Sequence, residues 1–232
     1  MTLPQFDSIF FAHIGGIIPA IIWLLFWLRE DRKRPEPRGL IMLTFLGGMV
    51  VVPIAILLQK ATYNPSSLFF TFLIWAALEE LIKFGAAYFT ALKRKEMNEP
   101  IDALIYMMTA ALGFVAIENT LFILNSLVSG DIIGSVITGN LRFVGASLLH
   151  TISSAAIGIS IALAFYKDEN TKRNYLAFGI IIAIALHAAF NLSIINETTS
   201  NTLATFGFVW IAIVVLMLVF EKVKKIYPVN KI

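Results

Sequence analysis

Apolar stretches of about 20 residues alternate with short polar segments along the whole chain. Because an α-helix rises about 1.5 Å per residue, such a stretch can cross a hydrocarbon core about 30 Å thick. We therefore predict an all-α fold, a polytopic transmembrane helical bundle. The predicted spans are residues 9–28, 40–58, 68–92, 101–127, 143–166, 175–195 and 202–220.

One segment of the apolar region does not fit this pattern. Residues 131–140 are rich in glycine and polar side chains, so we do not expect them to span the membrane. A short re-entrant or interfacial piece on the outer side and a plain loop are both compatible with the pattern. With a re-entrant or interfacial piece, Arg142 is expected near the lipid headgroups.

The loops between the predicted spans differ in charge. Lys and Arg concentrate in residues 29–38, 93–100, 167–174 and 221–225, whereas the alternate loops 59–67, 125–140 and 196–201 hold almost none. Positively charged loops stay on the cytoplasmic side. We therefore predict an outer N-terminus and a cytoplasmic C-terminus, for a single integral domain of residues 1–232 in the cell membrane.

Composition excludes several classes of function. Hydrophobic residues make up 58% of the 232 residues and charged residues 14%, with a mean hydropathy of +0.82, so the lipid bilayer is the expected surrounding. The net charge of +3 comes from Lys and Arg in loops on one side, so no nucleic-acid partner is indicated. The chain has no cysteine, which rules out a cysteine nucleophile and thiolate metal ligands.

Ionisable side chains occur inside four successive apolar segments. A charged side chain at the bilayer centre costs roughly 2.5–3.5 kcal/mol on insertion scales, so several together require a compensating reason. At the rise of an α-helix they lie at similar depths, roughly 10–17 Å from the outer ends of their spans. We predict that they meet in one polar cavity, within a core of about residues 68–195. The candidates are Glu79, Glu80 and Lys83 in the third span, Glu118 and Asn119 in the fourth, His150 in the fifth, and His187 and Asn191 in the sixth.

Helical spacing adds detail to this prediction. Lys83 lies three and four residues after the two glutamates, so it can pair with either carboxylate. Glu79 and Glu80 point about 100° apart around the helix, so only one of them can face the cavity centre. A purely structural Glu80–Lys83 ion pair is an alternative, as is helix–helix hydrogen bonding by a single histidine.

Carboxylates and imidazoles in one cavity can activate water in two ways. In the first, a glutamate acts as general base with a histidine, while Asn and Lys side chains stabilise the oxyanion. In the second, Glu118, His150 and His187 bind a divalent metal such as zinc, and another glutamate serves as base. Both routes give hydrolysis, and the sequence leaves the choice and the cofactor open. An HExxH zinc helix, a rhomboid-type serine motif and a pair of intramembrane aspartates are all missing.

The four motifs, in their order, resemble those of PrsW-type intramembrane proteases. LEELIK at 78–83 resembles the EExxK motif of this family, and GFVAIEN at 113–119 resembles the second motif. HTISSAAIG at 150–158 and LHAAFN at 186–191 resemble the remaining two. PrsW proteins are similar in turn to the CAAX-prenyl endopeptidases and the wider bacteriocin-processing superfamily. Two features depart from these patterns: the FxxxH of the CAAX enzymes is Phe114–Glu118 here, and the final HxxxD of many PrsW proteins is His187–Asn191.

The resemblance implies an intramembrane endopeptidase that cleaves a membrane protein or a membrane-anchored peptide. It implies that Glu79 is the base and that His150 and His187 are partners of water or metal. Asn191 would then donate to the oxyanion, with Glu80 and Glu118 also in the catalytic set. Lys83 and Asn119 would support them.

Two functions of other classes are compatible with the same residues. Buried carboxylates and histidines also mark the pathways of proton- or ion-coupled transporters, although no interrupted pair of repeats is visible in the chain. A catalytically inactive immunity or scaffold protein could keep the motifs without using them.

Overall fold

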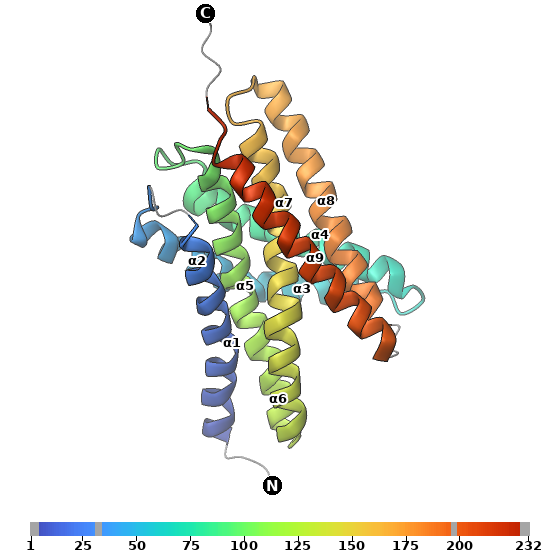
Figure 1. The fold of residues 1–232 in the computed structure, drawn as a ribbon. Helices are drawn as coiled ribbons and strands as arrows, with labels where there is room; N and C mark the ends of the chain where they lie inside the picture. The colour runs from blue at the N-terminus through green and yellow to red at the C-terminus, as the bar shows by residue number, and fades with distance from the viewer. Residues whose placement is uncertain (1–4, 31–33, 196–198, 228–232) are drawn as a thin grey trace, which may run out of the picture.

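The computed structural model describes residues 5–30, 34–195 and 199–227, and every regular element in these ranges is helical. The prediction of an all-α bundle is therefore confirmed. Figure 1 shows the helices: α1 (Gln5–Leu28), α2 (Arg38–Val50), α3 (Val52–Thr62), α4 (Leu68–Ala87), α5 (Pro100–Val128), α6 (Ile132–Leu141), α7 (Ser147–Leu163), α8 (Glu169–Ile195) and α9 (Thr199–Val223). Two π-helical segments, η1 (Tyr88–Leu92) and η2 (Arg142–Ala146), follow α4 and α6 directly.

Helix α5 forms the centre of the bundle. In its most apolar part 94% of the residues are buried, against 17% in α1, which faces outward. A helix that is apolar all round is typical of such a central position. Gly48 of α2 lies against the backbone of Ala110, and Gly113 of α5 lies against the backbone of Phe45, so a Cβ at either glycine would clash. These two glycines let the backbones of α2 and α5 approach closely, as small residues do between membrane helices.

Six helical segments are long and apolar enough to cross a membrane: Asp7–Leu28, Arg38–Thr62, Pro100–Val128, Ile132–Leu163, Glu169–Ile194 and Ala204–Val223. The predicted third span, 68–92, also forms a continuous helix, made of α4 and η1. It differs from the six in composition, because it carries Glu79, Glu80 and Lys83 in one helical turn. The helix that contributes most charge to the interior is thus the least typical membrane segment.

The second predicted span extends further than expected and changes direction once. Val51 separates α2 from α3, and Pro53 follows it in the first turn of α3, where its missing N–H breaks no helical hydrogen bond. The predicted loop 59–67 begins in the structure with the last turn of α3, so Gln59 is helical. This extension brings Gln59 opposite α4.

Residues 131–140, predicted not to span the membrane, are mostly helical, so a plain loop is not what the structure contains there. The Asp131 carboxylate caps α6 by accepting a hydrogen bond from the Gly134 N–H at 2.8 Å, and the helix then continues through η2 into α7. The N-cap by Asp131 stabilises the start of α6 and compensates for the low helix propensity of its two glycines. As a result Arg142, expected near the headgroups, lies on η2 beside Glu118.

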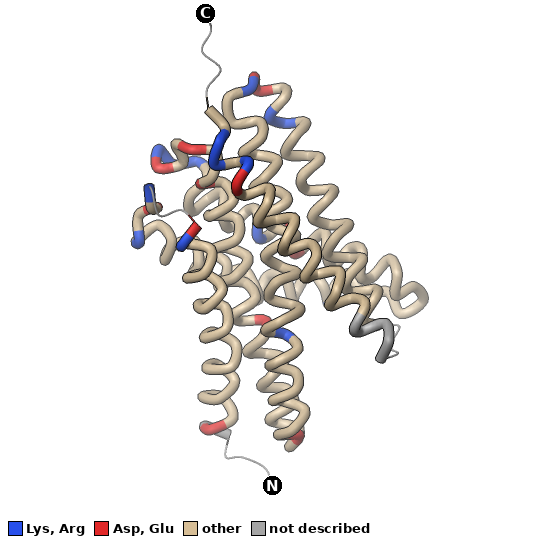
Figure 2. The backbone as a smooth tube through the Cα atoms, in the orientation of Figure 1, with Lys and Arg blue, Asp and Glu red and all other residues tan. Residues whose placement is uncertain are grey.

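Charge is distributed unequally between the two ends of the bundle. Figure 2 shows most Lys and Arg positions gathered at the end of the bundle where α9 ends, whereas α1 begins at the opposite end. The basic segments 93–100, 167–174 and 221–225 all lie at the end where α9 ends (Figure 1, Figure 2). Residues 31–33 of the first basic segment lie outside the described residues. The placement of this end in the cytoplasm stays a prediction of the charge rule.

Candidate active site

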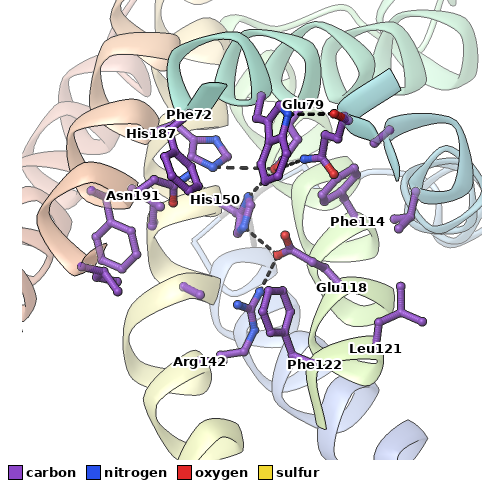
Figure 3. Close-up of a pocket in the computed structure, with 18 of the residues that line it drawn as sticks. Phe72, Glu79, Phe114, Glu118, Leu121, Phe122, Arg142, His150, His187 and Asn191 are labelled. Carbon is purple, nitrogen blue, oxygen red and sulfur yellow. Dashed lines mark hydrogen bonds and ion pairs between the residues drawn. The ribbon is translucent and has the colours of Figure 1, made fainter. Parts of the chain in front are cut away.

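The predicted ionisable residues meet between four helices. Glu79 of α4, Glu118 of α5, His150 of α7 and His187 of α8 all line one cavity of about 730 Å³ (Figure 3). The imidazole rings lie 4.8 Å apart between their centroids, and each carboxylate lies within 4 Å of at least one ring nitrogen. The predicted convergence of these four side chains is thus present in the structure.

Glu80 is not among the residues that line the cavity, and both of its carboxylate oxygens accept hydrogen bonds. Its Oε1 accepts from Lys83 Nζ at 2.5 Å and from His187 Nδ1 at 2.8 Å, and its Oε2 accepts from Ser154 Oγ at 2.8 Å. The side chains of Glu80 and Lys83 are completely buried. A buried ion pair requires such hydrogen bonds, because both charged groups have lost their hydration.

Glu79 is bonded on one oxygen only. Its Oε1 accepts a hydrogen bond from Gln59 Nε2 at 2.7 Å. Its Oε2 is buried and has no hydrogen-bond partner among the described residues. The nearest polar atoms are His187 Nε2 at 3.7 Å, His150 Nδ1 at 3.8 Å and Lys83 Nζ at 4.0 Å. A buried unsatisfied carboxylate oxygen is costly, so it indicates a place where water or an ion binds.

The partners of the two histidines define their tautomers. His187 donates from Nδ1 to Glu80, so its Nε2 presents a lone pair toward Glu79. His150 accepts from Lys83 at Nδ1, 2.9 Å away, so its Nε2–H donates to Glu118 at 3.0 Å. Glu80 and Glu118 therefore orient one imidazole each.

Arg142 lies at the end of the polar site away from Glu79, where it bonds to Glu118 and Asn119 (Figure 3). Its Nη2 donates to Glu118 Oε2 at 2.5 Å and its Nε donates to Asn119 Oδ1 at 2.6 Å. The guanidinium also lies 3.9 Å from the centroid of the Phe122 ring. Asn119 in turn donates to Ser147 Oγ at 3.1 Å, and is buried. Arg142 thus neutralises Glu118 and fixes the carboxylate that contacts His150.

Sequence reasoning did not identify Arg142 or Gln59 as site residues. Arg142 carried a signal, because it is a single basic residue within the otherwise uncharged segment 132–166. The η2 segment that presents it is a π-helix, a feature frequent at functional sites but invisible in the residue pattern. Gln59 carried no signal, since its role depends on how α3 packs against α4.

Three side chains could hold a metal ion together. One carboxylate oxygen of Glu79 and one ring nitrogen each of His150 and His187 lie within 4.8 Å of one another, and all three residues are buried. Glu79 Oε2 and His187 Nε2 face each other, and neither lone pair is used in a hydrogen bond, so the donor set fits a divalent cation such as zinc. The Nδ1 lone pair of His150 accepts a hydrogen bond from Lys83 in this structure.

The metal set expected from the sequence contained Glu118 in place of Glu79. Among the described residues, the group with convergent ligand atoms is the one with Glu79, whereas Glu118 bonds to Nε2 of His150 and to Arg142. The set with Glu118 stays a prediction. The geometry favours Glu79 as ligand and Glu118 as the partner that orients His150, a common arrangement around metal-bound histidines.

The remaining walls of the cavity are mostly apolar. Phe72, Phe114, Phe190 and Phe206 contribute aromatic rings, and Asn191 lies on the wall one turn after His187. The polar groups therefore gather at one part of a space that otherwise suits hydrophobic side chains. Such a cavity can accept an apolar chain segment and expose it to the carboxylates.

Comparison with known proteins adds independent evidence. A model of the family described as PrsW family intramembrane metalloprotease matches residues 36–220. Protease PrsW of Clostridioides difficile (strain 630) is 29% identical over 191 residues, which cover 78% of each chain. Protease PrsW of Geobacillus kaustophilus (strain HTA426) is 27% identical over 186 residues, 76% of each chain. No solved structure matches the chain. The matched range includes every polar residue of the cavity described above.

Proposed function

Because this chain belongs to the PrsW family of intramembrane proteases, we propose that its polar cavity is a peptidase active site. The protein is a multi-pass membrane peptidase, and the cavity contains groups that can activate water. The reaction would be hydrolysis of a peptide bond in or near a membrane segment of a protein substrate. Apolar walls around the carboxylates suit such a segment.

The observation that carries this proposal is the contact between Glu79 and His187. Oε2 of Glu79 and Nε2 of His187 lie 3.7 Å apart, too far for a direct hydrogen bond. With a neutral His187 imidazole both atoms present lone pairs, because the single ring proton lies on Nδ1 and is donated to Glu80. Two buried acceptors that face each other require a donor or a cation between them. A water molecule bound there would be polarised at once by a base and an imidazole.

In a reaction without a bound metal ion, Glu79 would act as general base. Its Oε2 removes a proton from the bound water while the water oxygen attacks the carbonyl carbon of the scissile bond. The amide N–H of Asn191 would donate to the oxyanion. The tetrahedral intermediate then collapses, the C–N bond breaks, and Glu79 returns its proton to the leaving nitrogen. Oriented histidines and the Glu118–Arg142 pair keep these groups in place.

A metal ion would be held by Glu79, His150 and His187. Bound there, a zinc-like cation would supply Lewis acidity and lower the pKa of a coordinated water. His150 would give up its hydrogen bond to Lys83, whose ammonium group would keep its 2.5 Å contact with Glu80. Glu118 and Glu80 would remain as the partners that orient the two imidazoles.

The test is cleavage by purified protein in liposomes. The protein is reconstituted with a library of single-span peptides, and new N-termini are identified by mass spectrometry. We expect Glu79→Gln and His187→Ala to lower cleavage by about 10²–10⁴-fold, the usual contribution of general acid–base catalysis. Glu169→Gln, which changes an exposed carboxylate far from the cavity, is the control. Processing at wild-type rates by either cavity variant, or no cleavage by the wild type, would refute the proposal.

A further inference from the structure

We propose that Gln59 is the positioning residue of the candidate base, and that it fixes which oxygen of Glu79 faces the imidazoles. This inference rests on the proposed function, because it assigns Gln59 a role through Glu79. Gln59 lies near the end of α3, in a segment that the residue pattern predicts to be a loop. It lines the cavity beside Glu79.

Two hydrogen bonds attach Gln59 to the same face of α4. Its side-chain Nε2 donates to Glu79 Oε1 at 2.7 Å, and its backbone oxygen accepts from Trp75 Nε1 at 3.0 Å. Trp75 and Glu79 are four residues apart, so both project from one face of the helix. The indole holds the backbone of Gln59 in place, and the carboxamide therefore reaches Glu79 from a fixed position.

The chemistry of an amide suits this position. A carboxamide N–H can only donate, so Gln59 ties down Oε1 without adding a charge next to the base. The other carboxylate oxygen, Oε2, is then left toward His150 and His187 at 3.8 and 3.7 Å. Without Gln59 neither oxygen of Glu79 would have a hydrogen bond from the described residues, and the carboxylate could rotate. A rotated carboxylate would present the wrong geometry to water or metal.

A positioning role predicts a specific pattern of kinetic effects. Gln59→Met keeps the length of the side chain and removes the donor. We expect kcat to fall by about 10–100-fold, the typical cost of losing a group that orients a ligand, with KM changed less than about twofold. Leu57→Ala, which alters an exposed apolar side chain on the same helix, should leave the rate and the thermal unfolding temperature unchanged.

A double-mutant cycle separates this role from a general structural one. In Glu79→Asp the shorter carboxylate no longer reaches Gln59, so adding Gln59→Met should cost little further activity. Full additivity of the two changes, an effect on KM instead of kcat, or wild-type kinetics of Gln59→Met would overturn the proposal. Any of these outcomes would overturn only the role of Gln59; the proposed peptidase function would still hold as long as Glu79→Gln is inactive.

Zinc binding gives a second measurement that needs no substrate. Purified protein is titrated with Zn²⁺ alone, and Gln59→Met should weaken binding by about 10–100-fold relative to the wild type. In the Glu79→Gln background the same change should have no effect. Equal zinc affinity of Gln59→Met and the wild type would contradict the positioning role of Gln59, even if the wild type cleaves its substrate. If the wild type neither cleaves nor binds zinc, both the function and the role of Gln59 are refuted.

Discussion

Glu79 and Glu80 are neighbours in the sequence but occupy opposite kinds of environment. Glu80 lies on the closed side of the site, where Lys83, Ser154 and His187 satisfy both of its oxygens. Glu79 lies on the open side, where Gln59 satisfies one oxygen and the other has no partner among the described residues. A turn of about 100° between successive residues is enough to separate them.

This difference assigns different tasks to two identical side chains. A carboxylate that accepts three hydrogen bonds from buried neighbours, as Glu80 does, can hold a framework together but is not directed at a substrate or a water molecule. A buried carboxylate oxygen without a hydrogen-bond partner lowers stability, and such atoms are found most often at functional sites. The closed side therefore suits structural support of the histidines. The open side suits the chemistry.

Metal removal should give the largest effect, and it acts on the open side. We expect a chelator to abolish cleavage by the purified protein and added zinc to restore it, because Glu79, His150 and His187 converge as a donor set. Metal content and cleavage are measured on the same samples. Unchanged cleavage after complete removal of metal would instead favour a mechanism in which Glu79 activates water with the imidazoles alone.

Glu80→Gln should be the most destabilising substitution, and it acts on the closed side. It leaves the Lys83 ammonium group buried without its closest countercharge, and breaking a buried ion pair in this way typically costs about 3–5 kcal/mol. Chemical unfolding in mixed micelles measures the loss. Glu79→Gln is the matched control and should change stability far less, since Glu79 Oε2 has no hydrogen bond to lose. Equal stability losses would mean that the two sides do not differ as described.

Two adjacent serines repeat this contrast on a smaller scale. Ser154 donates to Glu80 Oε2, whereas the buried hydroxyl of Ser153 has no partner among the residues described. Ser154→Ala should therefore lower stability by about 1.5–3 kcal/mol, the range for a hydrogen bond to a charged group. Ser153→Ala should be neutral or slightly stabilising in the same unfolding measurement. The reverse order would show that Ser154 does not support Glu80.

Arg142→Met should affect cleavage less than metal removal does, because Arg142 acts on His150 only through Glu118. We expect cleavage to fall by about 10–100-fold, equivalent to about 1.4–2.7 kcal/mol. Arg142→Lys should not restore activity, because one ammonium group cannot reproduce the planar pair of bonds to Glu118 and Asn119. Full rescue by lysine would show that charge alone is required there.

The sequence predicts those features that depend on one helix at a time. Apolar length predicts the spans, and the spacing of Glu80 and Lys83 predicts their ion pair, which the structure contains at 2.5 Å. The matched depth of Glu79 and His187 predicts that they meet. In each case the periodicity of a single helix and the cost of burying charge are sufficient.

Features that depend on contacts between helices could not be predicted in this way. Lys83 also donates to His150, which is 67 positions further along the chain and on another helix. Gln59 contacts Glu79 only because α3 extends one turn further than its residue pattern indicates. The continuity of α6 with α7 depends on capping by Asp131 and on a π-helical join, neither of which hydropathy describes.

The π-helical join has a consequence for the register of the long helix from Ile132 to Leu163. A wider turn takes up extra residues, and so it rotates everything before it relative to everything after it. Shortening this stretch by one amino acid would turn Arg142 by about 100° relative to His150. The guanidinium would then no longer be placed to bond both Glu118 and Asn119. The rotational position of one helix thus determines whether this cation meets its carboxylate.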